Sequence, residues 1–254
     1  MRIFKFIAVV SFISLYFMTA MPLYLFVLYR PQHLRGMLTK ILSFYSHLIV
    51  KVLGIELVLE GFKLDLKEEN YFIVSNHLSY VDILLIASKL PSCFVTSVEF
   101  KNTPFLGWLI KLTACLTVER RNKENIENEI EEISAALRNG ICVSVFPEAT
   151  STDGSSVLKF RHSLFQAAIN SNKKILPVTL NYYKINNRET DKRSRDSLFW
   201  YGEMTFFPHI LKLMKLKNIH ARLTIHEPLE SAGLDKATLA RTSQAVISSH
   251  YKSI

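Results

Sequence analysis

The sequence predicts an α/β domain with a central, largely parallel mixed sheet flanked by helices, preceded by an N-terminal membrane-embedded helical segment. Two observations favour this fold class. From residue 55 onward, short apolar runs of strand length alternate with segments of helical periodicity. Before them lies one long apolar run close to the N-terminus. We therefore expect two parts: a membrane anchor with an amphipathic helix in residues 1–54, and a globular domain in residues 55–254.

The N-terminal run is the first element. Residues 6–29 carry no charged side chain, and as a helix they would be about 36 Å long, enough to cross a hydrocarbon core of about 30 Å. A cleaved signal peptide is the alternative, but the run is long for one and no clear small-residue cleavage site ends it. Pro22 leaves a re-entrant hairpin open as well as a full span. Basic residues flank both sides, so they do not decide the orientation.

The remaining elements follow from periodicity. An amphipathic helix is predicted over residues 38–52, ending at Gly54. Strands are predicted at 55–60, 71–75, 93–97, 115–119, 141–146, 175–181 and 221–226. The clearest helix between them is 125–138, with an apolar stripe every three or four residues. The charged segment 184–196 is predicted to be a solvated loop.

Composition narrows the class of partner. The formal net charge of +9 favours anionic partners, either nucleic acid or an anionic bilayer. No helix-turn-helix, zinc-finger or RNA-binding signature is present, so we expect no nucleic-acid partner. The three cysteines lack CxxC spacing and lie in apolar surroundings, which indicates a reducing compartment without a disulfide or a metal site.

The stretch "SNHLSYVD" carries the first candidate chemistry. It follows the apolar run "YFIV", which places His77 at the carboxyl end of a strand and Asp82 in the first turn of the next helix. Ligands of open α/β sheets gather at such ends. An aspartate that accepts one ring N–H fixes the tautomer and leaves the other nitrogen basic. The pair can thus take a proton from a hydroxyl; a chance pairing of two polar loop residues is the alternative.

A second strand ends in the same manner. In "VSVFPEATSTDG" the apolar run gives way to Glu148, Ala149 and Thr150. Loops commonly contain such residues, so this segment alone is a weak signal. Its position after "SNHLSYVD" and behind an apolar anchor makes the combination more specific.

Together, "NHLSYVD" and "FPEAT" resemble the NHxxxxD and FPEGT blocks of the glycerolipid acyltransferases, the family that includes 1-acylglycerol-3-phosphate acyltransferase. The segment "GWLIKLTACLTVERR" resembles the second block of that family, with Glu119 and Arg120 at its end, and "ILPV" resembles the fourth block. The four blocks stand in the family's order and cover about residues 71–178. The longer form of the third block looks like a bacterial subgroup that includes acyltransferases for lyso-ornithine lipid.

The resemblance implies a reaction and roles for residues. His77 would be the general base that activates a lysolipid hydroxyl, with Asp82 as its orienting partner. The substrate-binding positions would be Arg120, Glu148 and Thr150. The acyl group would pass directly from a thioester to the hydroxyl, with acyl-CoA or acyl carrier protein as co-substrate and no cofactor.

Two departures from the family pattern concern the acceptor. Ala149 stands where the family has glycine, at a position that can require a positive φ. Ser151 stands where many members that use a phosphate acceptor have arginine, so Lys159 or Arg161 would have to supply that charge.

We therefore predict a membrane-bound O-acyltransferase of phospholipid biosynthesis, with 1-acyl-sn-glycerol-3-phosphate as the favoured acceptor and phosphatidic acid as product. Anionic membrane lipid, the lysolipid acceptor and the thioester donor are the expected partners. The expected location is the bacterial inner membrane, with the catalytic domain on the cytoplasmic side. The alternatives are an acyltransferase for another lysolipid such as lyso-ornithine lipid, a thioesterase or lipid hydrolase, and a non-catalytic lipid-binding protein.

Overall fold

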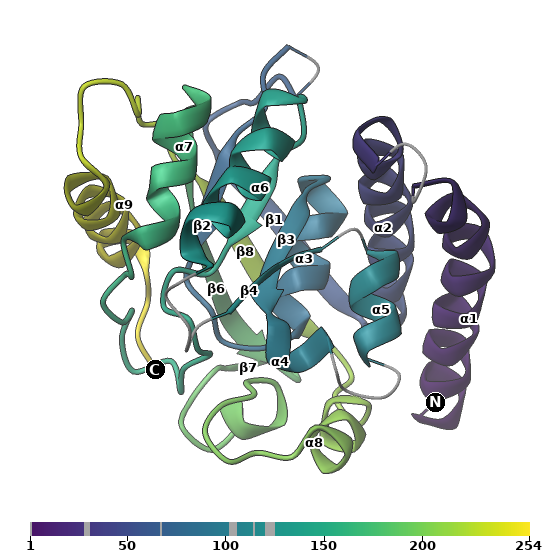
Figure 1. The fold of residues 1–254 in the computed structure, drawn as a ribbon. Helices are drawn as coiled ribbons and strands as arrows, with labels where there is room; N and C mark the ends of the chain where they lie inside the picture. The colour runs from purple at the N-terminus through teal and green to yellow at the C-terminus, as the bar shows by residue number, and fades with distance from the viewer. Residues whose placement is uncertain (1, 28–30, 67, 102–105, 114, 120–124) are drawn as a thin grey trace.

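The computed structural model describes residues 2–27, 31–66, 68–101, 106–113, 115–119 and 125–254 (Figure 1). The helices are α1 (Arg2–Val27), α2 (Pro31–Leu53), α3 (Val81–Lys89), α4 (Val98–Lys101), α5 (Leu106–Leu112), α6 (Ile126–Arg138), α7 (Gln166–Ser171), α8 (Phe206–Leu213) and α9 (Lys236–His250). The strands are β1 (Ile55–Gly61), β2 (Phe72–Ser75), β3 (Cys93–Ser97), β4 (Leu116–Val118), β5 (Val143–Val145), β6 (Ile175–Ile185), β7 (Arg188–Glu189) and β8 (Ile219–Ile225). Two short 3-10 turns are η1 (Ser163–Phe165) and η2 (Arg195–Ser197).

The sheet is mixed and largely parallel, as predicted. Within the described ranges it has eight strands in the order β1-β8-β6-β2-β5-β3-β4, with β7 paired to β6. β2, β3, β4, β5 and β6 run parallel, whereas β8 is antiparallel to β6 and pairs in parallel with β1. The carboxyl ends of the parallel strands therefore meet at one edge, where the segments that follow β2 and β5 lie together.

Helices cover both faces of the sheet, with α2 and α3 on one side and α6, α7 and α9 on the other (Figure 1). β2 shows why both faces are apolar. Phe72 and Val74 belong to the core beneath α6 and α7, whereas Ile73 belongs to the core beneath α2 and α3. Because successive strand residues point to opposite faces, a strand covered on both sides is continuously apolar.

The two N-terminal helices pack side by side and along the domain (Figure 1). The stretches Arg2–Leu25 and Arg35–Leu53 are both long and apolar enough to cross a membrane. The buried side of α1 contributes Val9, Tyr16 and Ala20 to the core shared with α2, and the Tyr16 hydroxyl donates to the Leu112 carbonyl of α5 at 2.8 Å. Most of the α1 surface is nevertheless exposed.

The charged segment 184–196 differs from the prediction. It is not only a solvated loop, because β6 continues to Ile185 and returns as β7. The connection is the two-residue turn Asn186–Asn187, and both residues have positive φ, 52° and 65°. Asparagine tolerates that conformation and favours two-residue hairpins. The many charged residues of the segment led to the prediction of a loop, although the pair Asn186–Asn187 is typical of a hairpin turn.

Candidate active site

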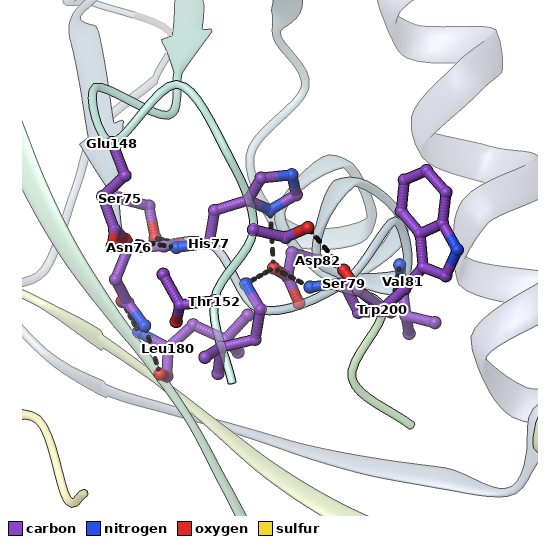
Figure 2. A network of polar contacts seen from close by, with 12 residues as sticks. Ser75, Asn76, His77, Ser79, Val81, Asp82, Glu148, Thr152, Leu180 and Trp200 are labelled. Carbon is purple, nitrogen blue, oxygen red and sulfur yellow. Dashed lines mark hydrogen bonds and ion pairs between the residues drawn. The ribbon is translucent and has the colours of Figure 1, made fainter. Parts of the chain in front are cut away.

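The loop after β2 is fixed to the sheet by a buried amide. The side chain of Asn76 donates to the Leu180 carbonyl at 2.9 Å and accepts from the Leu180 N–H at 2.8 Å (Figure 2). This pair of bonds ties the first residue after β2 to the neighbouring strand β6. The next residue, His77, therefore leaves the sheet in a defined direction.

His77 and Asp82 are in direct contact. The His77 Nδ1 atom lies 2.8 Å from Asp82 Oδ2, which also accepts the backbone N–H groups of Leu78 (2.6 Å) and Ser79 (2.9 Å) (Figure 2). Asp82 is fully buried in the first turn of α3. Surrounded by donors, it acts as a carboxylate acceptor, so the hydrogen of the imidazole lies on Nδ1 and Nε2 is the basic nitrogen.

The second carboxylate oxygen of Asp82 has a partner that sequence reasoning missed. The Tyr182 hydroxyl of β6 donates to Asp82 Oδ1 at 2.7 Å. Burial raises the pKa of Tyr182 well above its usual value, so the hydroxyl keeps its proton and can donate. Nothing in the local sequence indicates a contact between residues separated by 100 positions.

The imidazole is held against an aromatic ring. His77 stacks on Phe146 with ring centroids 4.0 Å apart and an interplanar angle of 14°, and 18% of its side chain is exposed. Phe146 follows β5, so the second candidate segment forms one wall of the site. The stack limits rotation of the imidazole while one edge stays accessible.

Glu148 joins the two segments. Its side chain is 5% exposed; one oxygen accepts the His77 N–H and the other accepts the Leu158 N–H, both at 2.8 Å. Burial raises the pKa of Glu148 to about 7, although both hydrogen bonds favour the ionised form. In this arrangement Glu148 fixes the backbone at His77.

The two departures from the family pattern have structural consequences. Ala149 has a φ of 61°, the left-handed conformation that glycine adopts without a steric penalty. The Ser151 hydroxyl donates to the Trp200 carbonyl, and the Trp200 N–H donates to the Leu78 carbonyl at 2.9 Å. Ser151 thus bonds to a segment that itself contacts the loop of His77.

The other expected substrate-binding residues differ in how they relate to the site. Thr150, Lys159 and Arg161 are exposed. Arg161 lines a cleft of about 390 Å³ at the carboxyl edge of the sheet, together with Phe146 and Ala149. The remaining lining residues are mostly apolar: Val95, Val118, Glu119, Ile126, Val145, Pro147, Ser163, Leu164 and Phe165. Arg120 lies outside the described residues.

Comparison with protein families identifies the chain. The model of the family described as Acyltransferase matches residues 50–181, which is more than half of the sequence. The chain belongs to the Acyltransferase family. The matched region runs from the end of α2 into β6 and contains the loop with His77 and Asp82 and the loop after β5. It ends at residue 181, one residue before Tyr182.

Two kinds of curated relative are similar to this region. A lyso-ornithine lipid O-acyltransferase of Rhizobium meliloti is 30% identical over 148 residues, 56% of this chain and 51% of that protein. A 1-acyl-sn-glycerol-3-phosphate acyltransferase of Neisseria gonorrhoeae is 34% identical over 145 residues, 57% of this chain and 55% of that protein. The matches span about half the length of these relatives.

A solved structure supports the fold. The 1-acyl-sn-glycerophosphate acyltransferase PlsC of Thermotoga maritima aligns with 98% of this chain and 95% of its own, with a TM-score of 0.62 and 21% sequence identity. The agreement covers the N-terminal helices as well as the α/β domain. Among the described residues there is no group of three or more His, Cys, Asp or Glu side chains placed to hold a metal ion.

Proposed function

We propose that the chain is a membrane-associated O-acyltransferase that moves a fatty acyl group from an acyl thioester to the free hydroxyl of a lysolipid. One observation carries this proposal. A histidine at the carboxyl edge of the sheet, His77, lies 2.8 Å from the fully buried carboxylate of Asp82 in a chain of the Acyltransferase family. A solvated surface pair would not require a carboxylate with four donors.

The geometry supports a general-base mechanism. His77 Nε2 takes the proton of the lysolipid hydroxyl as the oxygen attacks the thioester carbonyl, and the imidazolium is stabilised by Asp82 through Nδ1–H. The new C–O bond forms, the C–S bond breaks, and the leaving thiolate recovers the proton from Nε2. The products are the diacylated lipid and a free thiol, without a covalent acyl-enzyme.

The cleft beside His77 is the natural place for substrate. Phe146 stacks on the imidazole and also lines the cleft, so a molecule in the cleft lies next to the base. The apolar walls suit an acyl chain or a lipid tail, and Arg161 is a cation for an anionic head group. In the sequence, Arg120 directly follows Glu119 of the cleft wall. Thr150 directly follows Ala149, and Lys159 lies two residues before Arg161, so both are close in sequence to residues that line the cleft.

The favoured acceptor is 1-acyl-sn-glycerol-3-phosphate, with phosphatidic acid as product. Similarity to acyltransferases for this acceptor and the net charge of +9 support it. Acyl-CoA or acyl carrier protein would deliver the chain, and no additional cofactor is required. Lyso-ornithine lipid is the second candidate, because Ser151 brings no positive charge to a position where arginine would favour a phosphate, and because a lyso-ornithine lipid acyltransferase is similar over the same region.

We further propose that residues 1–54 form the membrane anchor and that residues 55–254 form the catalytic domain. Two apolar helices and an excess of positive charge support attachment to anionic lipid. The proposed location is the bacterial inner membrane, with the catalytic domain facing the cytoplasm.

Acyl transfer by the detergent-solubilised chain tests these proposals. Labelled long-chain acyl-CoA and acyl carrier protein would be supplied separately, each with lysophosphatidate, a neutral lysophospholipid, lyso-ornithine lipid or no acceptor. We expect acceptor-dependent transfer, fastest to lysophosphatidate and unaffected by a chelator.

The other outcomes separate the alternatives. Preference for lyso-ornithine lipid would keep the chemistry and make Ser151 a residue that determines the acceptor. Thioester loss that needs no acceptor would identify a thioesterase or hydrolase. Lipid binding without turnover of either donor would identify a non-catalytic lipid-binding protein and overturn the proposal.

A further inference from the structure

Helix α8 presents aromatic side chains to the exterior. Phe206 is 48% exposed and Phe207 is 66% exposed, whereas His209 and Leu213 on the opposite face are buried. An eight-residue helix with two exposed phenylalanine rings next to each other is unusual on a water-facing surface. The sequence leaves open whether this helix belongs to the core or faces a membrane, and the burial pattern shows that it does not lie wholly in the core.

The same helix borders the candidate active site. The ring of Phe206 lies 5.1 Å from the ring of Tyr80, and the Tyr80 hydroxyl lies 3.0 Å from Nδ1 of His209. Tyr80 belongs to the loop that carries His77 and directly precedes α3. A membrane that contacts the exposed face of α8 would therefore lie close to the loop that carries His77.

A buried lysine connects α8 to the first apolar helix. Lys5 of α1 is 7% exposed, and its ammonium group donates to the Leu53 carbonyl at 2.7 Å and to the Leu216 carbonyl at 2.9 Å. Leu216 lies three residues beyond the end of α8. The start of α1, where Ile3 is 75% exposed and Phe4 is 72% exposed, is thus fixed beside the turn that follows α8.

Charge indicates which partner this apolar surface fits. Lys212, Lys215 and Lys217 are exposed on and just after α8, and Glu203 is the only acidic residue between positions 203 and 217. Exposed aromatic rings next to lysines are typical of helices that lie in the interface of a bilayer with anionic lipids. Figure 1 shows α8 at the end of the molecule where α1 begins.

We propose that α8 is a second membrane-contact element, which inserts Phe206 and Phe207 among the lipids of an anionic bilayer and holds the loop that carries His77 near the membrane surface. The apolar face of α1 continues this surface. The inference goes beyond acyl transfer, and its first test does not depend on catalysis.

Depth-dependent quenching tests the contact. In Phe207→Trp, reconstituted into vesicles of brominated phosphatidylcholine and phosphatidylglycerol, the added indole should be quenched strongly after subtraction of the parent's Trp108 and Trp200 fluorescence. The matched control is Leu234→Trp, since Leu234 is 45% exposed just before α9. We expect at least twofold quenching at position 207, weaker quenching when phosphatidylglycerol is omitted, and none at position 234.

Two results would overturn the proposal. Quenching at position 207 as weak as that expected at position 234 would show that α8 does not enter the bilayer. A change at position 207 that follows protein concentration rather than lipid would assign this surface to a second copy of the chain.

A kinetic variant provides a separate test. Phe207→Ser should raise the KM for a lysolipid presented in vesicles about tenfold, since an inserted phenylalanine contributes at least 1.4 kcal/mol, and leave kcat unchanged. Activity on the same lysolipid in detergent micelles should stay at the parent's level. An unchanged vesicle KM would contradict the role of α8, whereas inactivity of the parent chain would instead contradict the proposed function.

Discussion

Asp82 is the most constrained polar side chain of the site. It accepts four hydrogen bonds: one from His77, two from backbone N–H groups, and one from Tyr182. Only the first of these is suggested by the sequence, because the spacing of five residues brings a helix-start aspartate back to a strand-end histidine. The bond from Tyr182 depends on the pairing of β2 with β6, which local patterns do not specify.

Removing that bond should lower the rate of acyl transfer. In Tyr182→Phe, Asp82 Oδ1 loses its donor in a fully buried position, which we expect to lower kcat/KM roughly tenfold or more, because a hydrogen bond to a charged group contributes about 1.5 kcal/mol or more. Steady-state kinetics of the variant and the parent measure this loss. An unchanged kcat/KM would show that Tyr182 does not help to position Asp82 for the reaction.

Glu148 should make stability depend on pH. Its pKa in the folded chain is about 7, against about 4.3 in an unfolded chain, so between these values the folded state binds more protons. Protonated Glu148 therefore contributes to the free energy of unfolding in full below about pH 4. This contribution is lost as the pH rises through 7, a change on the order of 3 kcal/mol. Glu148→Gln cannot titrate. The Tm of the parent minus the Tm of the variant should therefore fall from pH 5 to pH 7. A constant difference would contradict the raised pKa of Glu148.

Ala149 holds a conformation that glycine would adopt more easily. Ala149→Gly should therefore stabilise the loop, by about 1 kcal/mol, because the left-handed penalty of a Cβ atom disappears. The matched control is Ala135→Gly within α6, where the same substitution should destabilise by about 1 kcal/mol. Thermal unfolding of the two variants checks the opposite signs; a loss of stability at position 149 would argue against strain there.

At the scale of elements, the strands were predictable where burial is continuous. The predicted strands at 93–97 and 175–181 correspond to β3 and the first part of β6, because runs of apolar residues between turn signals identify a strand covered on both faces. The predicted strand at 55–60 corresponds to β1, which is the exception, because only Ile55 of β1 is buried. The sequence did not predict β7, because this strand has only two residues and both are charged and exposed. Their register comes from the Asn186–Asn187 turn rather than from an apolar pattern.

The attachment of α1 is another property that only the structure reveals. Lys5 reads as a basic flank of an apolar run, yet it satisfies carbonyl groups at the end of α2 and after α8. Lys5→Leu should leave these buried carbonyls without their donor, lower the Tm, and raise hydrogen exchange in the first turns of α1. Lys40→Leu, at an exposed position of α2, is the control and should change neither. Equal exchange in both variants would mean that Lys5 does not hold the helix.

At the scale of the whole molecule, the sequence predicted the fold class and the loops that meet at the carboxyl edge of the sheet. That prediction rested on the alternation of strand and helix patterns and on the four sequence blocks that resemble those of the glycerolipid acyltransferases. The sequence could not predict how the site is held together, since Asn76, Phe146 and Tyr182 act through contacts between separate strands. Nor could it reveal that the start of α1 is bonded to the turn after α8, and that α8 contacts the loop that carries His77.

The measurement that tests the central claim most directly is lysolipid-dependent acyl transfer by His77→Ala, compared with the parent and with His162→Ala, a control at an exposed histidine outside the His77–Asp82 pair. We predict that His77→Ala loses at least about a hundredfold in turnover, the range for a general base, while the variant stays folded at the assay temperature and binds vesicles as the parent does. His162→Ala should retain full activity. Turnover of His77→Ala within about tenfold of the parent, a barrier change of only about 1.4 kcal/mol, would contradict the assignment of His77 as the base.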